Sequence, residues 1–335
     1  MGIDLPIIWT VIIGFGLLMY VVMDGFDLGI GLIFPFVSDR TDRDVMVNSV
    51  APVWDGNETW LVLGGAGLLA AFPVAYSILL TALYLPLVLM LLGLILRGVA
   101  FEFRFKASER HRPLWDKAFA GGSYIATFCQ GVSLGAFLDG FRTEGTDFTG
   151  GALDCITPFS LFTGVALLAA YALLGSTWLV MKTEGPLNFR MAALAKIIVL
   201  AVLAAIAIVS AWTPLAHPAI AERWFSLPNL LFFSPVPILV LVLGWSLLRA
   251  LNQRAQTAPF LLTLMLLFVG YSGLAISLWP NIVPPAISIR DAAAPPESMG
   301  FALVGALLIV PVILAYTMWS YYVFRGKVRA GEGYH

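Results

Sequence analysis

Long apolar segments recur along the whole chain and constrain its fold more than any other feature. A helix needs about 20 mostly apolar residues to cross a bilayer. Nine segments meet or approach this length, and they cover residues 7–36, 54–72, 77–101, 117–138, 158–181, 192–213, 230–250, 259–280 and 299–324. We therefore predict an all-α polytopic membrane protein with nine transmembrane helices.

The composition supports the same conclusion. Of the 335 residues, 60% are apolar and 12% are charged, against about 25% charged residues in an ordinary soluble domain. This composition excludes a soluble enzyme, a secreted disulfide scaffold and a disordered chain. No long polar segment interrupts the series, so we predict one membrane domain over residues 1–335. The net charge of −1 gives no electrostatic footprint for nucleic acid.

The basic residues predict how the chain is oriented in the membrane. Cytoplasmic loops collect Lys and Arg. With the N-terminus outside, 16 of the 19 basic residues lie on the cytoplasmic side, and Arg142, Arg223 and Arg290 lie outside. We therefore predict an outside N-terminus and a cytoplasmic C-terminus. The first six residues carry no Lys or Arg, so the first apolar segment is not a secretory signal.

Histidine and cysteine positions limit the cofactors that this chain can hold. His111, His217 and His335 all lie outside the apolar segments. Haem in membrane oxidases commonly needs axial His, so we predict that the chain ligates no haem and no other metal. Cys129 lies in an apolar segment and Cys155 in a polar loop, and we expect both thiols to be unpaired. No phosphate-binding loop, zinc spacing or catalytic triad is present, so we predict no catalytic residue in this chain.

Acidic residues within the first apolar segment are candidates for function. A carboxylate at the bilayer centre costs about 2.5–3.5 kcal/mol on insertion scales, so such a residue usually faces a protein interior or a wet path. Asp24 and Asp27 are three positions apart and share one helix face. Gly25 and Gly29 would let another helix approach closely. The alternative is a glycine packing patch whose carboxylates cap nearby donors.

The second segment begins with a dense polar motif, the run WDGNETW. Asp55 and Glu58 share a face in this motif because they are three residues apart. Acidic residues are favoured in the first turn of a helix, so the alternative is a simple N-terminal cap. The neighbouring Trp54 and Asn57 exceed what a cap requires.

The third segment ends with Glu102 and with several basic residues. Glu102 can pair with Lys106 on an exposed helix surface, which is the alternative to a role in function. Arg97 is deeper, and we predict that it is the counter-ion of a buried carboxylate.

All these carboxylates fall in the cytoplasmic half of the first three helices. Buried carboxylates can hold and pass protons, so the sequence favours a proton path that opens to the cytoplasm. A proton-coupled secondary transporter also has polar groups near mid-membrane. Against a transporter, no matching set occurs in helices five to eight. A membrane scaffold with capping carboxylates is the third alternative.

Several motifs resemble one known family over almost the whole chain. They are DGFDLG at 24–29, NSVAPVWDGNETW at 48–60, RGVAFEFR at 97–104, WPNIVP at 279–284 and PVILAYTMWSYYVF at 311–324. Together they resemble subunit II of cytochrome bd-type quinol oxidases. The short loops resemble the cyanide-insensitive branch of that family.

The resemblance implies a fold and a role in the aerobic respiratory chain. It implies a first four-helix bundle over 7–138, a second over 158–280 and a final peripheral helix over 299–325. It also implies a heterodimer in the bacterial inner membrane, whose subunit I holds haem b, haem d and the quinol site. The complex would oxidise quinol, reduce dioxygen to water and generate a proton motive force. Subunit II would support assembly, and the resemblance leaves open a structural quinone and a small accessory subunit.

The resemblance also assigns residues to the proton route. The family's route carboxylates match Asp24, Asp55 and Glu102, although some members carry Asp in place of Glu102. Glu58 stands where some members carry Gln and would add a proton-binding group. The supporting residues of the site are then Asp27, Trp54, Asn57 and Arg97.

Overall fold

The computed structural model describes residues 4–329 and 331, and most of them are helical. Nine helices in this part of the chain have 18 or more residues. They are α1 (Leu5–Ile33), α3 (Trp54–Ala71), α5 (Tyr84–Arg104), α6 (Arg112–Asp139), α7 (Pro158–Lys182), α8 (Gly185–Ala216), α11 (Pro235–Asn252), α12 (Ala258–Leu278) and α13 (Pro296–Val323). Seven of the helical segments are long and apolar enough to cross a membrane. This confirms a mostly helical membrane protein.

The two long helices outside those seven are α3 and α6. Both are long enough to span a bilayer, but polar residues lower their hydropathy. In α3 these residues are Asp55, Asn57 and Glu58, and in α6 they include Asp116 and Lys117. The polar residues that lower the hydropathy of α3 belong to the WDGNETW motif, which the sequence analysis identified as a candidate for function.

Prolines divide two of the predicted helices. The helix predicted over 77–101 is wrong at its start, where the chain forms a separate α4 (Pro73–Ala82) before α5 begins. Pro86 cannot donate a backbone hydrogen bond, and in a continuous helix its ring would clash with the carbonyl four residues earlier. The break therefore falls at Leu83. Proline likewise starts α11 at Pro235, some residues later than predicted.

Several short elements connect the long helices; those at 34–36 and 229–233 fall at the ends of the segments predicted over 7–36 and 230–250, and the others were not predicted. They are the 3-10 helix η1 (Phe34–Phe36), the helices α2 (Arg40–Asn48), α9 (Pro218–Phe225) and α10 (Asn229–Phe233), and the strands β1 (Thr143–Glu144), β2 (Asp147–Phe148), β3 (Asn281–Val283) and β4 (Ile287–Ser288). The strands form two antiparallel hairpins, β1–β2 and β3–β4.

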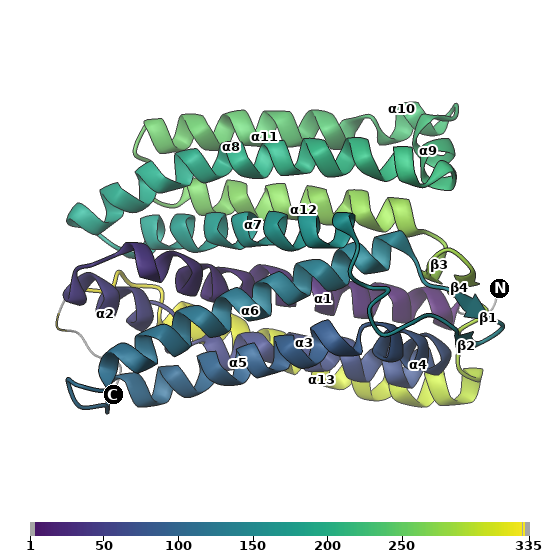
Figure 1. The fold of residues 1–335 in the computed structure, drawn as a ribbon, viewed down its shortest axis with the longest axis horizontal. Coiled ribbons are helices and arrows are strands. Elements are labelled where there is room, and N and C mark those ends of the chain that lie inside the picture. Colours follow the sequence, from purple (N-terminus) through teal and green to yellow (C-terminus); the bar gives the residue numbers. More distant parts are fainter. Residues whose placement is uncertain (1–3, 330, 332–335) are drawn as a thin grey trace.

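The long helices lie side by side along the longest axis of the molecule (Figure 1). In that view α8 and α11 form the upper edge, α7 and α12 lie beneath them, and α1 and α6 follow. At the lower edge are α3, α5 and α13. The element α2 lies at one end of the molecule, which we call the α2 end, and both β-hairpins lie at the other, which we call the hairpin end.

Glycines allow the closest helix contacts. A Cβ atom built on Gly29 would lie 1.9 Å from the carbonyl oxygen of Tyr171, and one built on Gly175 would lie 2.4 Å from the carbonyl carbon of Gly29. The backbones of α1 and α7 therefore touch at this crossing, as the small-residue pattern of the first segment predicts. A Cβ on Gly93 would lie 2.7 Å from the carbonyl oxygen of Gly122, so α5 and α6 use the same device.

A network of ion pairs around the buried Arg104 joins α2 to α5 and α6. The side chain of Arg104 is 1% exposed and contacts Asp44 at 2.8 Å and Asp116 at 2.6 Å. Asp44 also pairs with Arg112 at 2.5 Å, and Asp116 pairs with Arg43 at 3.1 Å. Each carboxylate thus has two arginine partners, and the network fixes α2 across the ends of the long helices.

Ion pairs also show which loops share an end of the molecule. Arg190 at the start of α8 pairs with Asp42 of α2 at 3.3 Å, so the turn between α7 and α8 lies at the α2 end. At the hairpin end, Arg290 pairs with Asp4, the residue before α1, at 2.6 Å. The loops predicted to lie on opposite sides of the membrane are therefore found at opposite ends of the fold.

A buried charged cluster in the first helices

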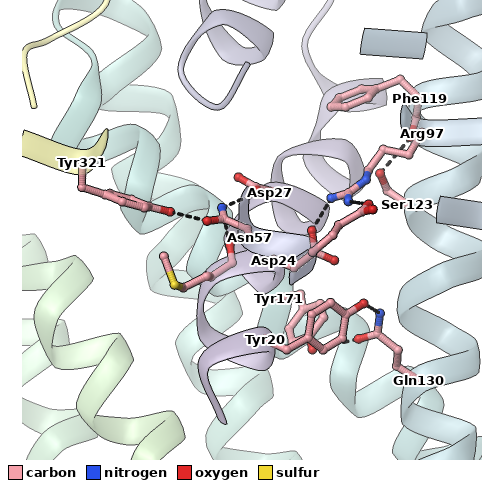
Figure 2. Close-up of polar contacts among 12 residues, drawn as sticks. Tyr20, Asp24, Asp27, Asn57, Arg97, Phe119, Ser123, Gln130, Tyr171 and Tyr321 are labelled. Atoms are coloured by element: carbon pink, nitrogen blue, oxygen red, sulfur yellow. Dashed lines mark hydrogen bonds and ion pairs between the residues drawn. The ribbon is translucent and has the colours of Figure 1, made fainter. Parts of the chain in front are cut away.

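Arg97 lies in the interior of the helix packing between two carboxylates (Figure 2). Its Nη1 atom is 2.5 Å from Oδ1 of Asp24, and its Nη2 atom pairs with Oε1 of Glu58. The side chains of Arg97 and Asp24 are 0% and 1% exposed, and that of Glu58 is 29% exposed. The pairing joins α5, α1 and α3, and it confirms Arg97 as the counter-ion of a buried carboxylate.

Asp27 belongs to a second set of contacts beside the first. Nδ2 of Asn57 donates to Oδ2 of Asp27 at 2.7 Å and to the backbone oxygen of Met23 at 3.3 Å. The hydroxyl of Tyr321, on α13, donates to Oδ1 of Asn57 at 2.9 Å. Asn57 therefore connects α3 with both α1 and α13, and Figure 2 shows the row from Tyr321 through Asn57 to Asp27.

Local packing explains why these polar groups face inward. The close crossing of α1 with α7 at Gly29 turns the same stretch of α1 into the molecule. The ring of Trp54 also lies beside Arg97, with its centroid 5.9 Å from the guanidinium carbon. Trp54 itself stacks on Phe101 at a centroid distance of 5.0 Å. Aromatic rings therefore pack against the guanidinium of Arg97, while the carboxylate of Glu58 stays partly exposed.

The cluster has more acidic groups than basic ones. Asp24, Asp27 and Glu58 are three carboxyl groups, and Arg97 is the one guanidinium that the described residues place among them. Oδ2 of Asp24 and Oδ1 of Asp27 are buried without a hydrogen-bond partner. Burying a charge without a partner is costly, and here three carboxyl groups share one guanidinium.

Three further polar residues extend the cluster. Nε2 of Gln130 donates to the hydroxyl of Tyr20 at 2.7 Å, and the hydroxyl of Tyr171 donates to Oε1 of Gln130 at 2.9 Å. Tyr20 lies four residues before Asp24 on α1, one helical turn away. Sequence analysis did not identify these residues. The one available signal was an amide side chain, Gln130, inside an apolar segment.

The structure does not bring Asp55 and Glu102 into the cluster. Asp55 is exposed in the first turn of α3. The carboxylate of Glu102 is 63% exposed and lies 3.4 Å from Nζ of Lys106, which is the exposed pair considered above. Asp55 and Glu58 are three residues apart, yet the first faces the molecular surface and the second reaches inward to Arg97.

The described histidines do not fit a haem. Nδ1 of His111 lies 2.9 Å from the hydroxyl of Ser108 at the α2 end, and Nε2 of His217 lies 3.4 Å from Asp139 at the hairpin end. Neither lies in the interior of a long helix, where an axial ligand would have to stand, and His335 lies outside the described residues. Within residues 4–329 and 331, no group of three or more His, Cys, Asp or Glu side chains could hold a metal ion.

The cysteines are also accounted for by the structure. Cys129 and Cys155 are both buried and free, as predicted. Burial raises the pKa of the Cys155 thiol, which lies in the loop before α7. A thiol with a raised pKa is a weak nucleophile and a weak metal ligand at neutral pH.

The fold and the cluster define a multi-pass membrane protein that buries ionisable groups among its first helices and α13. The characteristic sequence pattern of cytochrome bd terminal oxidase subunit II matches residues 5–324. The chain therefore belongs to that family and is a subunit of a terminal oxidase complex, which confirms the resemblance drawn from its motifs.

Individual relatives agree with this assignment. Subunit 2 of the cytochrome bd-I ubiquinol oxidase of Escherichia coli K12 is 30% identical, over 97% of this chain and 95% of that one. Subunit 2 of the cytochrome bd ubiquinol oxidase of Bacillus subtilis is 27% identical, over 97% of each chain. In fold, the chain is similar to a chain of the bd oxidase from Geobacillus thermodenitrificans, with a TM-score of 0.77, 11% identity and coverage of 96% and 98%.

Proposed function

We propose that this chain is subunit II of a membrane quinol:dioxygen oxidoreductase in the aerobic respiratory chain. The observation that carries the proposal is the family match over residues 5–324. Relatives that align with nearly the whole chain are named as subunits of ubiquinol oxidases. The chain acts with a haem-bearing subunit I, supports the assembly of that subunit and is not catalytic alone.

The second part of the proposal is that the buried cluster gives protons access to the site of dioxygen reduction. Reduction of dioxygen to water consumes protons, and carboxyl groups are the ordinary carriers of protons inside membranes. Glu58 is the half-buried member of the cluster, and Arg97 links it to the fully buried Asp24. Asp55 and Glu102 are exposed near the α2 end and would collect protons there.

Arg97 holds the two carboxyl groups in one arrangement without itself exchanging protons. A guanidinium stays charged at all physiological pH values. It therefore lowers the cost of a negative charge on either carboxyl group while a proton moves to the other. Asn57 fixes Asp27 beside this pair through a hydrogen bond of 2.7 Å.

The topology of the complex follows from the same proposal. All nine long helices span the bacterial inner membrane, α3 and α6 included, with the N-terminus outside and the C-terminus in the cytoplasm. The α2 end, which carries most of the basic residues, then faces the cytoplasm. The helices of 7–138 and of 158–280 form the two bundles, and α13 is the added helix.

The proposal places the haem groups outside this chain. Haem b and haem d belong to subunit I, because the described histidines of this chain do not fit an axial ligand. Quinol and dioxygen are substrates of the complex. A structural quinone, bound lipid and a small accessory subunit are further components that the proposal accommodates.

Purification of the chain with and without its partner tests the proposal. Expressed in its native host with an affinity tag on this chain, the protein should co-purify with a larger subunit and give a b- and d-type haem spectrum. Expressed alone, it should give no haem absorption. A stable, haem-free protein that purifies alone from native membranes would contradict the proposal and favour the transporter. The absence of Asp and Glu from α7, α8, α11 and α12 argues against that alternative.

A further inference from the structure

A hydrogen-bonded chain of three side chains, Tyr20, Gln130 and Tyr171, begins one helical turn from Asp24 on the side away from the α2 end. Tyr20 lies one helical turn before Asp24 on α1, which runs from the hairpin end to the α2 end. Gln130 on α6 lies next to Tyr20, and Tyr171 on α7 follows (Figure 2). The mechanism proposed above uses none of these three residues. They lie on the side of the buried carboxyl groups that faces the hairpin end.

The hydrogen bonds of this chain have a fixed direction. Tyr171 donates its one hydroxyl proton to Oε1 of Gln130, and Gln130 donates through Nε2 to the hydroxyl of Tyr20. The hydroxyl of Tyr20 accepts from Gln130, and Tyr20 itself lies four residues before Asp24 on α1. Both hydrogen bonds therefore run in the direction from Tyr171 to Tyr20.

The middle residue of the chain is the one that cannot carry a proton. Carboxyl groups and hydroxyl groups can release one proton and accept another. The carboxamide of Gln130 has N–H donors and an oxygen acceptor, but it neither gains nor loses a proton near neutral pH. A proton would have to turn the amide into a high-energy form to pass through it.

Helices α1 and α7 pack closely beside Tyr171. This packing leaves little room there for water molecules, which could otherwise carry protons past the amide of Gln130. A Cβ atom built on Gly25 would lie 3.0 Å from the ring of Tyr171 and 2.9 Å from Leu174. A Cβ on Gly29 would meet the backbone oxygen of Tyr171 at 1.9 Å. The side chains of Tyr20 and Tyr171 are buried.

Polar groups begin again just beyond Gln130. The hydroxyl of Thr163 donates to the backbone oxygen of Gly131 at 2.8 Å, and Ser160 follows one turn earlier on α7. The hydroxyl of Thr157 donates to Asp139 at 2.6 Å, and both residues line a pocket of about 300 Å³ at the hairpin end. Polar atoms therefore approach Gln130 from both ends of the fold.

We propose that Gln130 is a proton barrier, whose carboxamide prevents protons from passing between the Asp24 cluster and the hairpin end of the membrane. This inference rests on the proposed function, because a barrier is needed only if the cluster exchanges protons. With the barrier in place, the cluster is open to the α2 end alone. An oxidase that builds a proton gradient across the same membrane loses less of it through this subunit.

The experiment replaces the amide by a group of the same shape that exchanges protons. The complex of this chain with subunit I is reconstituted into liposomes without quinol, a pH step is applied with valinomycin and K⁺ present, and an internal pH dye reports proton entry. Gln130→Glu should raise the passive proton flux about tenfold, as a barrier lowered by about 1.4 kcal/mol would do. Gln130→Met, of similar length and without exchangeable protons, should stay as tight as the native complex.

The haem spectrum verifies assembly of each variant before its flux is measured. If Glu at this position prevents assembly, Gln130→His supplies another group that exchanges protons near neutral pH. An assembled Gln130→Glu or Gln130→His complex that is as tight as the native one overturns the proposal. An equal leak in Gln130→Met also overturns it, because altered packing would then be the cause.

A second substitution tests whether the leak passes through the cluster. In Gln130→Glu combined with Asp24→Asn, the extra flux should fall back to the native level. If the leak persists in the double variant, protons pass residue 130 without using Asp24. That result overturns the proposal that Gln130 separates the hairpin end from the Asp24 cluster. Failure of the proposed function has a different signature, namely full quinol oxidase turnover in Asp24→Asn alone.

Discussion

At the scale of single residues, the arginine in the cluster determines which carboxyl groups can act together. Arg97 contacts Asp24 and Glu58 at once, although these residues are 34 positions apart and lie on different helices. Breaking a buried pair by removing one partner commonly costs about 3–5 kcal/mol. Asp24 and Glu58 share one guanidinium, so the loss of one carboxylate still leaves Arg97 with a partner. Single amide substitutions are therefore informative about proton transfer.

The first prediction compares carboxyl groups with their amides. Asp24→Asn and Glu58→Gln keep shape and hydrogen bonding but remove the exchangeable proton. Quinol oxidase turnover should fall about tenfold, or about 1.4 kcal/mol on the barrier, while the haem spectrum is retained. The matched control is Glu144→Gln, which changes an exposed carboxylate at the hairpin end and should leave turnover unchanged. Native turnover in both cluster variants would refute proton access through this site.

The second prediction separates two roles of Asp55. If Asp55 collects protons for Glu58, Asp55→Asn should lower turnover about tenfold. If it serves only as a helix cap, Asn should replace it nearly fully, because Asn caps a helix as well as Asp does. We expect the loss of turnover, measured as quinol-dependent oxygen uptake by an assembled complex. Full activity would remove Asp55 from the path and leave the capping role.

At the scale of elements, the glycine crossing of α1 and α7 positions the stretch that carries both buried aspartates. A methyl group on Gly29 would overlap the backbone oxygen of Tyr171, so Gly29→Ala should separate the helices and reduce assembly of the complex severely. Gly65→Ala is the control, because a Cβ at Gly65 meets nothing within 4 Å. The yield of haem-containing complex from membranes measures both. Similar yields for the two variants would show that the close crossing is dispensable.

The ion pairs of α2 provide a fourth prediction. Arg104 is buried between Asp44 and Asp116. Arg104→Met should therefore destabilise the α2 end by about 3 kcal/mol, which is near the low end of the cost of breaking a buried pair. The cost is at the low end because each carboxylate keeps one other arginine partner. Thermal unfolding of the complex and proteolysis of the loop before α6 are the measurements. Unchanged unfolding would show that α2 does not depend on the network.

The exposed pair Arg40–Glu109 is the control for that network, and its pH dependence can be stated. A hydrogen bond from Arg40 lowers the pKa of Glu109 below its usual value. Any stabilisation by this carboxylate is therefore present above its unfolded-state pKa and is lost as the pH falls through the lowered folded-state pKa. Exposed pairs contribute little, so Glu109→Gln should leave the unfolding temperature almost unchanged at pH 7.

At the scale of the whole molecule, the ends of the fold predict its orientation. Reporter fusions in the β3–β4 region, within residues 281–298, should be active on the outer side, and fusions after α13 should be active in the cytoplasm. The reason is the excess of basic residues at the α2 end. If both fusions are active on the same side of the membrane, α13 does not cross it, and the prediction of nine spans is wrong.

The whole molecule also leaves large apolar surfaces uncovered, and α13 is the clearest case. Only 6% of the apolar window of α13 is buried, and residues such as Phe301, Tyr316 and Trp319 are exposed. Yet its C-terminal end is fixed, because Tyr321 contacts Asn57 and Nζ of Lys182 donates to the backbone oxygen of Phe324 at 2.5 Å. The outward faces of α13 are thus available to lipid or to the partner subunit.

The sequence by itself determined the membrane class, most helix positions and the polar motifs. Apolar length and loop charge are local properties, so they could be read without knowing which helices meet. The same is true of Asp24, Glu58 and Arg97 as candidates, since an ionisable residue in an apolar segment needs a partner wherever it lies.

Tertiary structure alone decided which candidates act together. Spacing places Asp55 and Glu58 on one face, but α3 turns Glu58 toward Arg97 and leaves Asp55 exposed. The chain of Tyr20, Gln130 and Tyr171 comes from three helices, and no spacing within one segment could reveal it. Helix rotation and crossing depend on contacts between distant residues, such as Gly29 with Tyr171, and only the folded molecule fixes them.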